Sequence, residues 1–102
     1  MSKKKFTPHF RYNYARRHPA FIYDEFNDEY KYIGLTHSPT TYGHNNIKLR
    51  WNPNPNDPRA SYMRPFSTHQ KKRKFARHKL FGFELNKTNK KIASKIKKNY
   101  RQ

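Results

Sequence analysis

The stretch from residue 30 to residue 64 constrains the fold most strongly. Its segments with the residue pattern of a β-strand are separated by loops whose composition excludes helix. The segment Tyr30–His37 alternates well enough to be a strand. A polar loop with Pro, Gly and paired Asn separates it from a second alternating segment, Ile47–Trp51. Three prolines then exclude helix and central strand from residues 52–58, since proline lacks an amide donor and restricts the residue before it. The run Arg59–Arg64 follows as one more predicted strand, so the stretch indicates a sheet joined by rigid loops.

The second alternating segment also predicts which side chains face the core. Successive side chains of an extended strand point to opposite faces of the sheet. Ile47, Leu49 and Trp51 are therefore expected in the core, while Lys48 and Arg50 point to the other face. That other face is where a phosphate could bind.

The residues ahead of this stretch predict a β-hairpin with an acidic turn. Pro19 can start a strand, and the aromatic and β-branched run Ala20–Tyr23 suits one. Asp24–Glu29 holds four of the six acids, and Tyr30–His37 would return antiparallel. Divalent metal sites need carboxylates from separate elements, whereas these acids lie together in one turn. We therefore expect a solvated turn that neutralises nearby lysines, and no metal.

The C-terminal part predicts a basic loop, a strand and a helix. Ser67–Lys79 is expected to be an exposed loop that serves as a phosphate-binding patch, and the alternation of Leu80–Leu85 suits a last strand. Asn86 or Thr88 can cap a helix, and the remaining surface of that helix is rich in lysine. Its apolar stripe would consist of Leu85, Ile92, Ile96 and Tyr100.

These elements together predict an α+β fold, a small antiparallel sheet of about four to five strands with a C-terminal helix packed on it. Residues 18–102 would form a single domain that ends in the basic helix. Residues 1–17 carry six cations, no acid and four aromatic rings. They are interpreted either as a basic aromatic arm that tracks phosphates and stacks on bases, or as a flap whose aromatic rings pack irregularly over the sheet.

The charge of the chain points to a polyanionic partner. The formal net charge is +18 for 102 residues, far more than solubility needs, and self-repulsion at that charge opposes a compact state. Disorder is the competing interpretation, because low hydrophobicity with high charge is its usual signature. An aromatic content of 17% instead favours a folded centre, so nucleic acid is the expected partner.

Several classes of chemistry are excluded by what the sequence lacks. The chain has no cysteine, which rules out disulfides, thiolate catalysis and Cys-type zinc sites. It shows no glycine-rich phosphate loop, no nucleophile elbow and no His pair at helical zinc-ligand spacing. It also has no apolar run of signal-peptide or membrane-spanning length, so a cytoplasmic protein with no membrane partner is expected. Cleavage of RNA without metal or other cofactor remains compatible with the composition.

Such cleavage needs a base for the 2′-hydroxyl, an acid for the leaving oxygen and cations around the phosphorane. His37 is the first candidate for acid or base, because it ends a predicted strand and imidazole titrates near ~6.5. The alternative is that its ring only caps the strand end by hydrogen bonding. The expected catalytic residues are His37, Arg64, Tyr62, Arg50 and His18. The expected nucleic-acid-binding residues are Thr36, Ser38, Lys48, Lys71, Lys72, Arg73, Lys74 and Arg77.

Short motifs between residues 18 and 85 carry a family resemblance. They are His18-Pro19, Tyr32–Ser38 (YIGLTHS), Leu49 with Asn52–Pro55 (NPNP), and Ser61–Pro65 (SYMRP). This pattern resembles a phage- and mobile-element-associated branch of the barnase/EndoU/colicin/RelE-like RNase superfamily.

The resemblance implies a small antiparallel sheet with a flanking helix and a metal-independent endoribonuclease activity of the toxin type, a hydrolase without cofactors. It places Thr36, His37 and Ser38, with the strand of Tyr62 and Arg64, on the active face. The implied partners are RNA, either ribosome-associated or tRNA, and an acidic antitoxin or immunity protein. Some members of the branch are binding versions without activity.

The alternative function is that of a non-enzymatic, basic nucleic-acid-binding accessory protein of a phage or mobile element. Its function would be indifferent to His37 and Arg64 and sensitive to the basic ends of the chain. Both functions would depend on salt, because both bind through phosphates.

Overall fold

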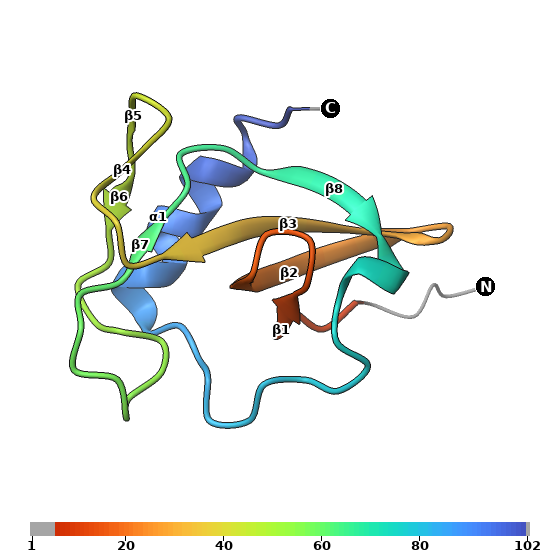
Figure 1. Ribbon diagram of the computed structural model, residues 1–102, viewed down its shortest axis with the longest axis horizontal. Helices are drawn as coiled ribbons and strands as arrows, with labels where there is room; N and C mark the ends of the chain where they lie inside the picture. The colour runs from red at the N-terminus through yellow and green to blue at the C-terminus, as the bar shows by residue number, and fades with distance from the viewer. Residues whose placement is uncertain (1–5, 102) are drawn as a thin grey trace.

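The centre of the fold is the antiparallel hairpin of β2 (His18–Phe26) and β3 (Glu29–Thr36) in the computed structural model, which describes residues 6–101. This hairpin extends across the molecule (Figure 1). The predicted hairpin is therefore confirmed, and the acids lie in its turn (Asp28) and in the strand ends that flank it (Asp24, Glu25 and Glu29). Both strands run further into the acidic segment than the sequence predicted. The register pairs Ala20 with Gly34.

The sheet is antiparallel and has the strand order β1-β2-β3-β7-β6, with β8 also paired to β3. A separate two-stranded hairpin, β4-β5, follows β3, and the chain ends in one helix. The α+β class with an antiparallel sheet and a C-terminal helix is thus as predicted, with six strands in the main sheet. The bounds are β1 (His9–Asn13), β4 (Thr40–Thr41), β5 (His44–Asn45), β6 (Ile47–Lys48), β7 (Tyr62–Met63), β8 (Thr68–Lys71), the 3₁₀ helix η1 (Lys72–Lys74) and α1 (Lys87–Lys97).

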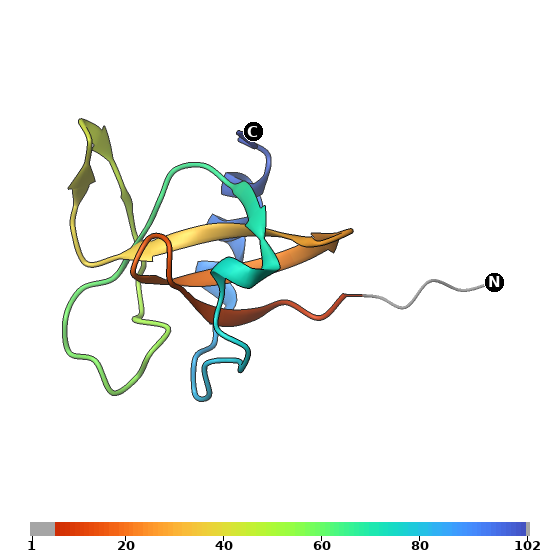
Figure 2. The same ribbon diagram turned by 45° about the vertical axis from the view of Figure 1, so that its right-hand side comes forward.

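The hairpin buries apolar side chains on both faces, because its residues alternate. On one face α1 packs over a core that includes Ile33 and Leu35. On the other, a smaller cluster forms around Tyr32 and Phe75. Figures 1 and 2 show α1 behind the hairpin and the η1 segment in front of it. The smaller cluster leaves the end of the hairpin near His18 uncovered by a helix.

Helix α1 begins where the sequence predicted. The Asn86 side chain caps it by accepting a hydrogen bond of 2.8 Å from the backbone N–H of Asn89. Leu85 and Ile96 of the predicted stripe are buried, whereas Tyr100 lies past the helix and is partly exposed.

The prediction that Ile47–Trp51 forms a strand with three core residues is wrong. The strand β6 ends at Lys48, and only Leu49 joins the core. Trp51 is 61% exposed. The reason is that β6 lies at the edge of the sheet against the very short β7. The N–H of Leu49 still donates to the Ser61 carbonyl (2.9 Å), but the N–H of Arg50 bonds to the Asn89 side chain of the helix instead.

The predictions for residues 67–85 are also wrong in part. Ser67–Lys79, expected to be a loop, contains β8 and η1, because its first half pairs with the free edge of β3. Leu80–Leu85, expected to be a strand, is an irregular connection. Its amides bond singly to separate partners, Leu80 to Phe10 (2.8 Å) and Glu84 to Pro53 (3.1 Å), so no ladder forms.

Residues 1–17, interpreted as an arm or a flap, contribute an ordered element. Strand β1 pairs with β2 along its whole length and forms one edge of the sheet. Lys3, Lys4 and Lys5, which belong to the proposed arm, lie outside the described residues.

The buried side chain of Asn89 joins α1 to the loop after β6, and replacing it should destabilise the fold. Its Nδ2 donates to the Trp51 carbonyl (2.7 Å), and its Oδ1 accepts from the Arg50 N–H (3.1 Å). Asn89→Ala leaves both backbone groups without these partners and is expected to lower the free energy of unfolding by about 1–3 kcal/mol. Urea denaturation measures this change, with the exposed Asn45→Ala as control. An equal effect of the two substitutions would contradict the bridging role.

Candidate functional site

A cavity of about 300 Å³ opens on the sheet face opposite α1, at the end of β3, and is called the Arg64 cavity below. Ala20 and Gly34 lie side by side on its floor, and neither has a side chain large enough to fill the space. A Cβ atom on Gly34 would lie only 3.3 Å from Cγ of Arg64. The glycine therefore lets the aliphatic part of Arg64 lie across β3.

One wall of the Arg64 cavity is the turn between β1 and β2, which lies over β3 in Figure 1. The buried side chain of Asn13 holds this turn, because its Oδ1 accepts from the N–H groups of Ala15 (2.9 Å) and Arg16 (3.2 Å). Its Nδ2 donates to Gln70 of β8 (2.9 Å). The turn thereby presents Arg16 to the cavity.

Arg64 stands on the opposite wall. Its backbone N–H donates to Gly34 (2.9 Å), and its guanidinium lies 5.0 Å from the ring centroid of Phe66. Burial lowers the pKa of Arg64, and repulsion from Arg16 lowers it further. Its Nε is buried without a hydrogen-bond partner among the described residues. Within residues 6–101 no acid pairs with Arg64 or Arg16, so a bound anion would relieve both the repulsion and the missing bond.

The same cavity holds a proton acceptor and a proton donor, His18 and Tyr32. Desolvation lowers the pKa of His18, and repulsion from His37 and Arg64 lowers it further, so its ring is mainly neutral at pH 7. No hydrogen bond within the described part of the chain engages that ring. Burial raises the pKa of Tyr32 despite the opposing influence of Arg16, so the hydroxyl keeps its proton.

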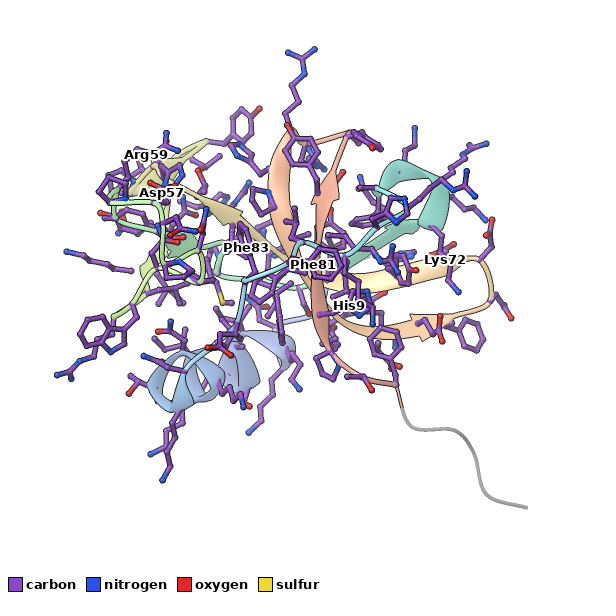
Figure 3. The ribbon with its side chains drawn as sticks, turned by 90° about the horizontal axis from the view of Figure 1, so that it is seen from below. His9, Asp57, Arg59, Lys72, Phe81 and Phe83 are labelled. Carbon is purple, nitrogen blue, oxygen red and sulfur yellow. The ribbon has the colours of Figure 1, made fainter. Side chains whose placement is uncertain are left out.

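His37, the first candidate from the sequence, lies in a neighbouring hollow and is engaged at both ring nitrogens. Its Nδ1 bonds to the Ala60 carbonyl (2.9 Å), and its Nε2 lies 3.0 Å from Oδ2 of Asp57. Arg59 holds the same carboxylate through Nε and Nη2, each at 3.0 Å; Asp57 and Arg59 are seen together in Figure 3. This geometry favours the alternative interpretation, in which His37 fastens the end of β3 to the proline-rich loop.

The guanidinium of Arg59 should keep Asp57 ionised at pH values below the ordinary pKa of 3.8. Hydrogen bonds from Arg59 lower the pKa of Asp57 from 3.8 to about 2. A carboxyl group with a lowered pKa stabilises the folded state above pH 3.8, and this contribution is lost as the pH falls toward 2. NMR titration of the carboxyl carbon should therefore give a midpoint near 2 in the wild type and closer to 3.8 in Arg59→Ala.

Arg17→Ala is the matched control for that titration, since Arg17 lines the same hollow but makes no bond to the carboxylate. It should leave the midpoint unchanged. An ordinary midpoint of 3.8 in the wild type would show that the Asp57–Arg59 pair does not form.

The other predicted residues, both catalytic (Tyr62, Arg50) and nucleic-acid-binding (Thr36, Ser38, Lys48), divide between the Arg64 cavity and its surroundings. Thr36 lines the cavity, and its Oγ1 accepts from the Ser38 N–H (3.1 Å), so the two residues shape the end of β3. Tyr62 is next to Thr36 in the register but is not part of the cavity wall. Lys48 and Arg50 lie in a different hollow, beside Trp51.

The predicted phosphate-binding run is not brought to the Arg64 cavity. Lys72 pairs with Glu25 (2.7 Å) and Lys71 with Glu29 (3.7 Å), so both lysines neutralise the acidic turn, as the sequence suggested. The other three members are exposed: Arg73, Lys74 and Arg77.

The sequence analysis did not assign a functional role in this cavity to Arg16, Tyr32, Tyr42 or Phe66, which all line it. Asn13 three residues before Arg16 was a usable signal, because Asn often bonds to the backbone of a following turn. The others carry no local signal. Tyr42 is 87% exposed at the tip of the β4-β5 hairpin and has a positive φ of 49°.

Comparison with known proteins does not add a family to this geometry. No protein-family model, curated protein or solved structure matches the chain. No helix within residues 6–101 is long and apolar enough to cross a membrane. In the same part of the chain, no group of three or more His, Cys, Asp or Glu side chains could hold a metal ion. The resemblance to RNases rests on the sequence motifs.

Proposed function

We propose that this protein is a metal-independent endoribonuclease of the toxin type, from the phage and mobile-element branch that its motifs resemble. The observation that supports this best is the content of the Arg64 cavity. A neutral His18, a protonated Tyr32 and the two guanidinium groups of Arg16 and Arg64 line one space of about 300 Å³. These are the base, the acid and the anion-binding groups that RNA cleavage requires.

The proposed reaction begins when His18 accepts the proton of the 2′-hydroxyl. The 2′-oxygen then attacks the adjacent phosphorus, and Arg16 and Arg64 stabilise the charge of the phosphorane. The bond from phosphorus to the 5′-oxygen breaks, and Tyr32 donates its proton to that oxygen. The products are a 2′,3′-cyclic phosphate and a 5′-hydroxyl end. Return of the proton from His18 to Tyr32 through water restores both groups.

The net charge of +18 supports RNA as the substrate, because a strongly positive surface attracts and orients a polyanion. We place this reaction in the cytoplasm, on ribosome-associated RNA or tRNA. The toxin assignment includes an acidic antitoxin or immunity protein that would cover the cationic surface.

A non-enzymatic nucleic-acid-binding function is the second candidate, and one observation favours it. His37 is engaged at both ring nitrogens, which leaves His18 as the histidine of the Arg64 cavity. With a single histidine available, an RNase must use Tyr32 or water as the acid. A binding protein needs neither acid nor base, only the cations.

The deciding experiment incubates the purified protein with end-labelled RNA in EDTA and maps the product ends. Cleavage that leaves 2′,3′-cyclic phosphate ends, and that is lost in His18→Ala and Arg64→Gln, supports the RNase proposal. Tight binding without cleavage rejects that proposal in favour of the binding protein. The same cleavage reactions should be repeated with Mg²⁺ in place of EDTA. Cleavage that occurs only with Mg²⁺ would contradict the metal-independent mechanism.

A further inference from the structure

The indole ring of Trp51 is displayed on a backbone that is held firmly. The ring is 61% exposed. The Trp51 carbonyl accepts from Nδ2 of the buried Asn89 (2.7 Å), and the N–H of Arg50 bonds to Oδ1 of the same side chain (3.1 Å). Because the backbone is held, only the two side-chain torsions of Trp51 lose freedom when a planar group stacks on the indole.

Cations surround this ring. Lys48, Arg50 and Arg59 line the same hollow as Trp51. Aromatic rings on which bases stack, placed among cations that follow the backbone, are the usual features of single-strand binding surfaces.

The hollow around Trp51 and the Arg64 cavity both adjoin a third hollow, the one that contains His37. The hollow that contains His37 shares His18 and Thr36 with the Arg64 cavity, and it shares Asn52 and Arg59 with the hollow around Trp51. The three hollows therefore follow one another from Arg64 past His18 to Trp51, and together they are called the groove below.

The one acid within this groove does not repel a phosphate backbone. Asp57 is mostly buried, and its carboxylate is bonded by Arg59 and His37. Arg17 adds a further cation at the middle of the groove. The groove as a whole is thus suited to a flexible polyanion.

We propose that this groove binds single-stranded RNA, with the scissile phosphate in the Arg64 cavity and a base stacked on Trp51 at the far end. The proposal rests on the RNase function and extends it from a cleavage centre to an extended substrate site. A duplex is disfavoured, because its bases are already stacked on one another and cannot reach the indole.

Trp51 is the only tryptophan, so fluorescence excited at a wavelength that tyrosine does not absorb reports on this position alone. The probe is a single-stranded 2′-O-methyl oligonucleotide of about eight nucleotides, a length within the range that single-strand sites cover. The methyl group blocks the 2′-oxygen, so the probe binds but is not cleaved. Titration should quench the Trp51 emission with the same Kd that the anisotropy of a fluorescein-labelled copy gives.

The variant Trp51→Leu should weaken binding of this oligonucleotide by roughly 5- to 150-fold, the range expected for loss of one stacked base. It should leave the Kd of a dinucleotide, which reaches only the Arg64 cavity, unchanged. Trp51→Tyr should restore most of the affinity. Phe81→Leu is the matched control, because Phe81 is 92% exposed but lies on the segment before α1, away from Asp57 and Arg59 (Figure 3).

Oligonucleotide binding with unchanged Trp51 emission, or an equal Kd for Trp51→Leu and wild type, would overturn the extended groove. Such a result leaves the RNase proposal standing if Arg64→Gln still weakens the binding. Failure of wild-type protein to bind the oligonucleotide at all would reject both proposals.

Discussion

Replacement of His18 by alanine should reduce kcat for RNA cleavage by about 10²–10⁴-fold, the usual contribution of a general base. The ring of His18 is only partly desolvated and no hydrogen bond within the described residues engages it, and alanine keeps the backbone pairing with Asn13, so the fold should be unaffected. The binding of uncleavable RNA should change little, because the phosphate is held by arginines. Single-turnover cleavage with mapped product ends measures the rate.

The pH profile separates a base from a structural residue at position 18. Because desolvation lowers the pKa of His18, the wild-type kcat/KM should fall in acid with a midpoint below 6.5, where the imidazole takes up a proton. This acid limb should vanish in His18→Ala. An unchanged limb would mean that another group is the base.

Two other histidines serve as controls for this prediction. His78→Ala changes an exposed ring outside the groove and should leave the rate as in the wild type. His37→Ala breaks the bonds to Ala60 and Asp57, so it should lower stability and still retain cleavage with an acid limb. If His37→Ala removes activity while the protein stays folded, the assignment of His18 is wrong and that of His37 is restored.

Arg64→Gln should lower kcat by about 10²–10³-fold, which is the loss seen when one preorganised donor to the transition-state anion is removed. Glutamine keeps an aliphatic stem beside Gly34, so the packing that the close contact requires is retained. The slope of log Kd for RNA against log salt concentration should also decrease by about one, which corresponds to the loss of one phosphate contact. Rates under single-turnover conditions and Kd at several salt concentrations measure the two effects.

Arg73→Gln is the charge-matched control, because Arg73 is exposed in η1 and lies outside the Arg64 cavity. It should affect binding weakly and leave kcat unchanged. Arg64→Lys should recover only part of the activity, since an ammonium group does not reproduce the planar, two-pronged contact of a guanidinium. Equal losses in Arg64→Gln and Arg73→Gln would show that general charge matters and that the cavity does not.

The elements that the sequence predicted well depend on neighbouring residues. The β2-β3 hairpin follows from two extended runs around a short turn, and α1 follows from a cap at Asn86 and a periodic apolar stripe. These patterns depend on residues only a few positions apart, and the tertiary contacts of the folded protein do not change the elements that they predict. Two of the predicted catalytic residues, His18 and Arg64, line one cavity because the segments that carry them both bond to β3 near Gly34, which is a tertiary arrangement.

The elements that the sequence missed depend on distant partners. Thr68–Lys71 has little strand propensity of its own and becomes β8 because the edge of β3 is free to pair with it. Trp51 fits an alternating strand, yet it is exposed. The side chain of Asn89 in α1 bonds to the N–H of Arg50 and to the carbonyl of Trp51, so these groups do not pair with a strand. No local rule relates these positions.

The sequence by itself determined the class of the fold, the hairpin, the helix and the cationic character that favours RNA, because composition and short-range periodicity are sufficient for these. Only the tertiary structure decided which histidine is available. His37 has the better local context, but Asp57 and Ala60, 20 or more positions away, occupy both of its ring nitrogens. His18 is left with a neutral ring beside Arg64, because desolvation and the electrostatic field of a cavity depend on groups that the chain brings together only on folding.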